Sequence, residues 1–163
     1  MRRLLAILML AAAVLSCAAD VDMSRPLSGG PVFSGRFDSK DAERCWSSGD
    51  IISLFIGTTY NHQYVFQGQN GATEGEFRET STPVWLSQKT VATNYAVFPY
   101  STSLSLTTTG DLMVSLPKLQ HYAGGNPDQS SNIMVAATAE KTSKSLVFRN
   151  VCGYLKVRLF GAG

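Results

Sequence analysis

The residues of this chain that could act as nucleophiles, bases or metal ligands are few and lie far apart in the sequence. The histidines are His62 and His121, and the cysteines are Cys17, Cys45 and Cys152. Neither histidine has a second ligand at the spacing of a zinc motif, and no Gly-x-Ser-x-Gly segment presents a serine nucleophile. Catalytic residues that lie far apart in the sequence can be neighbours in the fold. A Ser-His-Asp hydrolase, or a thiol enzyme that uses Cys45 and His121, therefore stays open as an alternative. The sequence favours a protein that is not an enzyme, without metal or cofactor.

Four acidic residues precede the first clear strand: Asp38, Asp41, Glu43 and Asp50. Carboxylates can hold calcium, but this segment lacks the Asp-x-Asp-x-Asp-Gly spacing of a calcium-binding loop. We therefore interpret it as a solvated segment rich in turns.

Cys17 follows a short apolar run over residues 4–15, and Arg2 and Arg3 precede that run. A basic head, an apolar stretch and small residues at a cut site are typical of a secretory signal. A transmembrane helix would need about 20 apolar residues, more than this run supplies. Residues 14–17, Val-Leu-Ser-Cys, resemble the lipobox of bacterial lipoproteins. That resemblance implies cleavage before Cys17 and acylation of its sulfur and new amino group; the alternative is an ordinary signal peptide.

Composition places the chain among neutral secreted domains. It has 14 Lys and Arg residues against 12 Asp and Glu residues, and the predicted signal removes two of the basic ones. A nearly neutral chain with scattered charges gives no reason to expect a nucleic-acid partner. Outside the cytoplasm Cys45 and Cys152 are candidates for a disulfide, and the alternative is two buried thiols.

Short runs of Thr, Ser, Val, Tyr and Phe, separated by turn residues, predict strands along most of the chain. Residues 51–56 and 60–66 predict a hairpin around Gly57, and 117–132 predict a long loop. The other expected strands are 84–86, 93–98, 104–107, 112–116, 133–137, 145–148 and 152–160, with a weak strand at 32–37. This spacing predicts an all-β antiparallel β-sandwich of about seven short strands. We expect a signal at 1–16, a tether with a removable N-terminal strand at 17–44, and the sandwich at 45–163.

Two aromatic residues are the candidates for ligand contact. Tyr122 lies in the expected loop 117–132, and Trp85 lies in the short expected strand 84–86. The rings of both residues could stack on sugars. Core and edge packing explains aromatic residues in a β domain equally well.

Four segments, in order, resemble the fimbrillin-like family of Bacteroidota, lipoproteins that build or anchor surface pili. They are residues 46–51 (Trp-Ser-Ser-Gly-Asp-Ile), 95–100 (Tyr-Ala-Val-Phe-Pro-Tyr), 116–120 (Leu-Pro-Lys-Leu-Gln) with 132–136 (Asn-Ile-Met-Val-Ala), and 146–157. The resemblance implies a transthyretin-like β-sandwich in a lipoprotein of the outer membrane, exposed at the cell surface. Members usually carry a second sandwich, which this sequence does not extend far enough to include.

The resemblance also implies assembly with other pilus subunits by strand exchange. An Arg-specific protease would remove the N-terminal strand, and a segment of the next subunit would take its place. The candidate cut sites are Arg25, Arg36 and Arg44, with Arg36 the first choice. The expected function is a structural subunit or anchor of a pilus that serves adhesion. The alternative is a lipid-anchored module that binds glycans or host proteins through its loops.

Overall fold

The structure is a computed structural model that describes residues 30–41, 44–80, 89–116, 118, 122–123, 126–127 and 132–151. Within these residues the protein is all-β, as the sequence predicts, with one short 3-10 helix, η1 (Ser39–Asp41). The strands are β1 (Phe33–Phe37), β2 (Ile51–Thr58), β3 (His62–Phe66), β4 (Glu74–Glu79), β5 (Thr90–Phe98), β6 (Ser105–Leu106), β7 (Leu112–Met113), β8 (Tyr122–Ala123), β9 (Asn126–Pro127), β10 (Met134–Ala137) and β11 (Ser145–Asn150).

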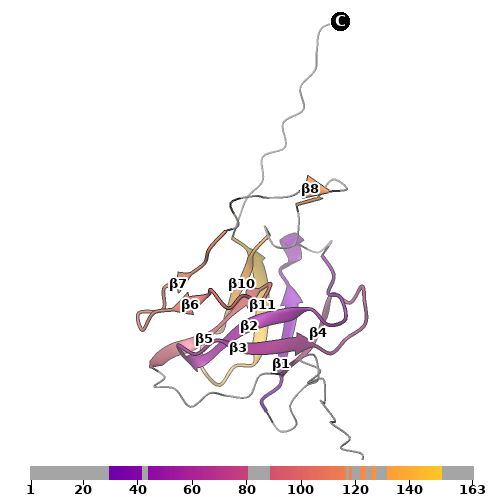
Figure 1. The fold of residues 1–163 in the computed structure, drawn as a ribbon. Helices are drawn as coiled ribbons and strands as arrows, with labels where there is room; N and C mark the ends of the chain where they lie inside the picture. Colours follow the sequence, from indigo (N-terminus) through magenta and orange to yellow (C-terminus); the bar gives the residue numbers. More distant parts are fainter. Residues whose placement is uncertain are drawn as a thin grey trace, which may run out of the picture.

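Seven of these strands form one sheet that closes on itself in the order β1-β11-β10-β5-β2-β3-β4 (Figure 1). β1 pairs with β4 in antiparallel fashion and with β11 in parallel fashion, and the other five pairs are antiparallel. The all-β class is confirmed, but the sheet is a closed barrel rather than two separate layers. The physical reason is β1, because its two sides hydrogen-bond to the two ends of the strand order and join them.

The N-terminal strand is part of the main sheet, although the sequence predicts only a weak strand there. Residues 32–37 predict a weak strand inside a tether, whereas β1 lies within the main sheet. β4 is a strand that the sequence analysis missed, because Phe77 is surrounded there by charged residues. The predicted strands at 84–86 and 152–160 lie outside the described residues.

Aromatic side chains fill the interior of the barrel around Trp46, which is fully buried. The ring of Trp46 contacts five phenylalanines, at centroid distances between 4.1 and 5.8 Å: Phe37, Phe66, Phe77, Phe98 and Phe148. A tight turn follows this residue, in which the Ser47 N–H donates to the Asp50 carboxylate at 2.8 Å and Gly49 adopts a φ of 84°. The turn leads directly into β2, since Gly and Asp are residues that favour tight turns.

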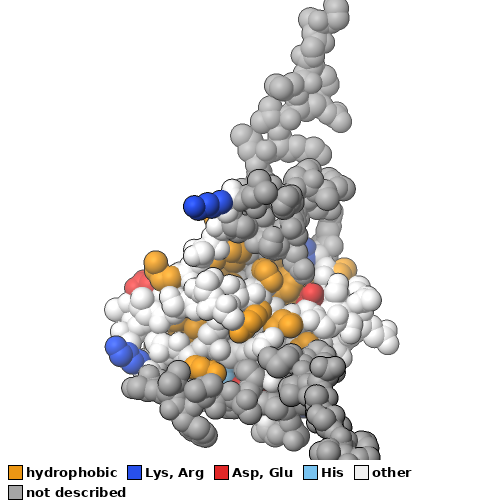
Figure 2. Space-filling view, viewed as in Figure 1, with side chains coloured by type: hydrophobic (Ala, Val, Ile, Leu, Met, Phe, Trp, Pro, Cys, Tyr) orange, Lys and Arg blue, Asp and Glu red, His pale blue; other side chains and the backbone are white. Residues whose placement is uncertain are grey.

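A second apolar cluster lies on the outer side of the sheet. The hairpin β6–β7 lies against β5 at the left of Figure 1, and its buried residues join those of β2 and β5. The cluster consists of Phe55, Val91, Val97, Leu104, Leu106 and Ile133. Figure 2 shows apolar side chains at the surface on this side of the molecule, with few charged ones among them. Met113 and Leu116 are exposed large apolar residues of the same region.

Candidate functional site

The candidate site is the position that β1 occupies between β4 and β11. Along β1, the residues Phe33, Gly35 and Phe37 are buried on the inner face. The side chains of Ser34 and Arg36 face solvent. This alternation is the two-residue period of a strand with one buried face. β1 therefore places two aromatic rings in the core and leaves a polar outer surface.

Each aromatic ring of β1 occupies its own place in the core. Phe33 is 1% exposed and meets Tyr64 edge to face at a centroid distance of 5.7 Å. Phe37 is 7% exposed and stacks on Trp46 at 4.1 Å. Buried phenylalanines each contribute about 1.5–3 kcal/mol to folding through loss of apolar surface from water. The two rings thus fasten β1 to the rest of the barrel.

Gly35 lies between the two rings, where the interior has no room for a side chain. A Cβ atom at this position would lie 2.7 Å from a ring carbon of Phe77 and 3.3 Å from one of Phe148. Gly35 is opposite Gly75 of β4, whose own Cβ would lie 2.5 Å from the Phe66 ring. The glycine pair lets the core rings approach the backbone of β1 and β4.

The end of β1 is fixed by polar contacts with β11. The Asp38 N–H donates to the Phe148 carbonyl at 2.9 Å, and the Asp38 carboxylate accepts from Arg149 Nε at 2.8 Å. The Lys40 N–H also donates to this carboxylate, at 3.1 Å. The hydrogen bond from the Lys40 backbone, and then the one from Arg149, hold the pKa of Asp38 below its ordinary value. Asp38 thus links the C-terminal end of β1 to β11 through both its backbone and its side chain.

The candidate cut sites differ in their settings. Arg36 has an exposed side chain, but its backbone lies inside β1, in register with Glu74 of β4 and Val147 of β11. Arg44 lies outside any strand, between η1 and Trp46. Its side chain is half-buried, and its guanidinium lies against the side-chain amide of Asn132. Arg25 lies outside the described residues.

Several other predicted site residues cannot be placed. Cys17, Trp85, Cys152 and His121 lie outside the described residues, and Tyr122 belongs to β8 without a described side chain. Cys45 is an exposed free cysteine next to Trp46 in the sequence. The pairing of Cys45 with Cys152 stays a prediction.

The sequence analysis missed a polar pair at one end of β3 and β4. His62 Nδ1 lies 2.7 Å from Glu79 Oε1, and their side chains are only 12% and 7% exposed. The Tyr60 ring packs edge to face on the imidazole at 4.6 Å. Burial, and then the Glu79 carboxylate, raise the pKa of the Tyr64 hydroxyl. The alternation of Phe77 and Glu79 along β4 is the one sequence signal that could have pointed to a buried carboxylate here.

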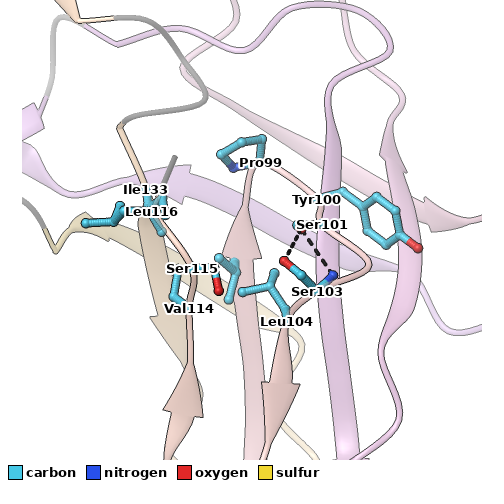
Figure 3. A pocket seen from close by; sticks show the side chains of 10 residues that line it. Pro99, Tyr100, Ser101, Ser103, Leu104, Val114, Ser115, Leu116 and Ile133 are labelled. Atoms are coloured by element: carbon cyan, nitrogen blue, oxygen red, sulfur yellow. Dashed lines mark hydrogen bonds between the residues drawn. The ribbon is translucent and has the colours of Figure 1, made fainter. Parts of the chain in front are cut away.

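A groove of about 350 Å³ opens between β5, the chain before β6 and the segment after β7. Figure 3 shows Leu104, Val114 and Ile133 among its apolar walls, with the ring of Tyr100 pointing away from them. The Ser101 and Ser103 hydroxyls lie 2.8 Å apart at its rim. Its described lining residues are mostly apolar, with hydroxyl groups at the edge, and among them there is neither a titratable pair nor a nucleophile beside a base.

In the described part of the chain, no group of three or more His, Cys, Asp or Glu side chains is placed to hold a metal ion. In the same residues, no helix has the length and apolar character needed to cross a membrane. Comparison with models of known families, with curated proteins and with solved structures gives no match to this chain.

Proposed function

We propose that this protein is a lipid-anchored, surface-exposed structural subunit or anchor of a pilus, which assembles by β-strand exchange and serves adhesion. The supporting observation is the place of β1, which comes first among the described strands and closes the sheet from both sides. In this proposal the barrel corresponds to a transthyretin-like β-sandwich, and β1 bridges its two layers. Lipid on Cys17 would deliver the domain to the outer membrane.

Loss of β1 would leave a site that only another strand can fill. The edges of β4 and β11 would present unpaired N–H and C=O groups, which readily add a strand from another chain. The places of Phe33 and Phe37 would be open to water, with the Tyr64 and Trp46 rings exposed at their bases. A segment from a second subunit that restores both the hydrogen bonds and the rings would be held firmly.

The geometry favours Arg44 over Arg36 as the processing site. Hydrolysis after Arg36 would need the protease to bind a segment whose backbone already pairs with two strands. It would also leave Phe37 stacked on Trp46. Hydrolysis after Arg44 would free all of β1 while Trp46 keeps its place in the core. Cys45 would become the new amino terminus.

The proposal is tested by controlled cleavage with an Arg-specific protease. The full chain is treated under native conditions, and native mass spectrometry follows release of the N-terminal fragment and capture of an added β1 peptide. We expect cleavage after Arg44 followed by one-to-one capture. Arg44→Gln should block both steps, whereas Arg36→Gln should leave them unchanged. A cleaved protein that neither releases its fragment nor binds the peptide would contradict strand exchange.

The groove of Figure 3 favours a second candidate function, a lipid-anchored module that binds glycans or host proteins. Its apolar walls and serine hydroxyls would contact the two faces of a sugar ring. A glycan array with the intact domain separates the two functions. Saturable binding that is lost in Leu104→Ser or Trp85→Ala, and kept in Ser34→Ala, would favour the module.

A further inference from the structure

We infer that the β1 site selects its incoming strand by sequence: it accepts aromatic–x–Gly–x–aromatic and rejects any strand with a side chain at the central position. This inference rests on the strand exchange of the proposed function and names the chemistry of the partner strand. The two aromatic positions are those of Phe33 and Phe37, and the central one is that of Gly35.

The central requirement follows from the packing around Gly35. A Cβ there would meet the Phe77 ring at 2.7 Å, a separation that side-chain carbons do not tolerate. Phe77 cannot simply rotate away, because its ring is fully buried and lies 5.0 Å from Trp46 and 5.3 Å from Phe66. Overpacking a filled core in this way is destabilising. The lack of room for a side chain at the central position is therefore a property of the acceptor barrel. It applies to any donor strand that binds in the same register.

The flanking requirement follows from the two rings that β1 places in the core. The incoming side chain at the first position must pack against Tyr64, and the one at the fifth position must pack against the face of Trp46. Flat rings fill these places, since each contact is ring against ring at 5.7 Å and 4.1 Å. Smaller side chains would leave cavities beside buried aromatic residues.

The outer face of the site adds a preference of charge. On β4, Glu76 is opposite Ser34 and Glu74 is opposite Arg36, and both glutamates are exposed. Opposite charges on directly paired residues stabilise a sheet, and like charges destabilise it. A donor with Lys or Arg between the glycine and the second aromatic residue is therefore favoured over one with an acidic residue there.

The sequence of the chain itself offers this spacing once. Among its glycines, only Gly35 has an aromatic residue two positions away on both sides. The C-terminal residues Leu155, Val157 and Leu159 have the spacing of a strand face, but they place a branched side chain where glycine is required. Because cleavage after Arg44 removes residues 33–37, the matched donor between copies of this chain is therefore residues 33–37 of a second copy that has not been cleaved.

The test uses the full chain cleaved after Arg44 and four labelled peptides that span residues 31–38. They are the native sequence, Gly35→Ala, Arg36→Glu and, as the matched control, Ser34→Ala, whose changed side chain faces solvent. Fluorescence anisotropy measures exchange of each peptide against the resident strand. We expect the native and Ser34→Ala peptides to bind alike, Gly35→Ala to bind at least about tenfold more weakly, and Arg36→Glu to bind more weakly than Ser34→Ala.

The outcomes separate the inference from the function on which it rests. Equal binding of the native and Gly35→Ala peptides would overturn the sequence rule and leave strand exchange intact. Binding of none of the peptides would overturn strand exchange, and the rule with it. A Phe77→Leu acceptor gives an independent check, because a smaller side chain there should reduce the penalty of the Gly35→Ala peptide. The peptide comparison on the unchanged acceptor decides the matter if that variant does not fold.

Discussion

Phe37→Ala should destabilise the protein strongly, because Phe37 is one of the two aromatic residues that pack β1 against the core. Its side chain is 7% exposed, and its ring stacks on Trp46 at 4.1 Å with an interplanar angle of 22°. Replacement of a buried phenylalanine by alanine typically costs about 3–5 kcal/mol, which includes the cavity that is left. Native domains have about 5–15 kcal/mol of stability in total. The change should therefore lower the melting temperature by roughly 10–20 °C.

Urea unfolding of the intact chain measures this loss directly. Tryptophan fluorescence, to which the buried Trp46 contributes, follows unfolding, and circular dichroism follows the sheet as a second probe. Ser34→Ala is the matched control, since it changes an exposed side chain of the same strand and should shift the free energy of unfolding by less than about 0.5 kcal/mol. A loss below about 1 kcal/mol for Phe37→Ala would refute the reasoning. It would mean that β1 is not a packed part of the native barrel.

Three further predictions concern the Asp38 carboxylate, the buried Asn94 amide and the lipid on Cys17. A carboxylate whose pKa is depressed in the folded state stabilises it above the unfolded pKa and loses that effect as pH falls through the folded pKa. Asp38 is such a group, so urea midpoints between pH 6 and pH 2 should fall less steeply in Asp38→Asn, with Arg149→Gln lowering the midpoint at neutral pH. Asn94 is fully buried and its amide donates to two backbone carbonyls at 3.0 Å, so Asn94→Ala should cost about 1–3 kcal/mol by the same urea assay. Cys17→Ala should abolish incorporation of a radiolabelled fatty acid in cells, and labelling that persists would contradict the lipobox.

The sequence predicts the strands better than their arrangement. Residues 32–37 show the two-residue alternation of β1, and residues 51–66 show the β2–β3 hairpin. What they cannot reveal is that β1 pairs with β11 more than 100 residues later in the chain, as the register of Ser34 with Ser145 requires. Pairings of that kind depend on long-range registers, which no local pattern encodes. The sequence therefore predicts the all-β class, but it does not predict that β1 closes the sheet.

β4 and its buried pair show a second limit of the sequence. Apart from Phe77, this strand consists of glycine and charged residues, so it shows little of the apolar alternation by which strands are recognised. Glu79 is buried because His62, 17 residues earlier, lies beside it in the β3–β4 hairpin. The choice of cut site shows the same limit, because it depends on strand pairing that the sequence does not reveal. Arg36 is attractive as a sequence motif, and only the pairing of its backbone on both sides favours Arg44 instead.

Native mass spectrometry of the chain cleaved after Arg44 tests the central claim, that β1 is a replaceable strand, most directly. The account predicts that an added peptide of residues 31–38 displaces the resident N-terminal fragment and binds once per molecule, and that Arg44→Gln prevents the exchange. A cleaved protein that keeps its own fragment and takes up no peptide, under conditions where the barrel stays folded, would contradict it.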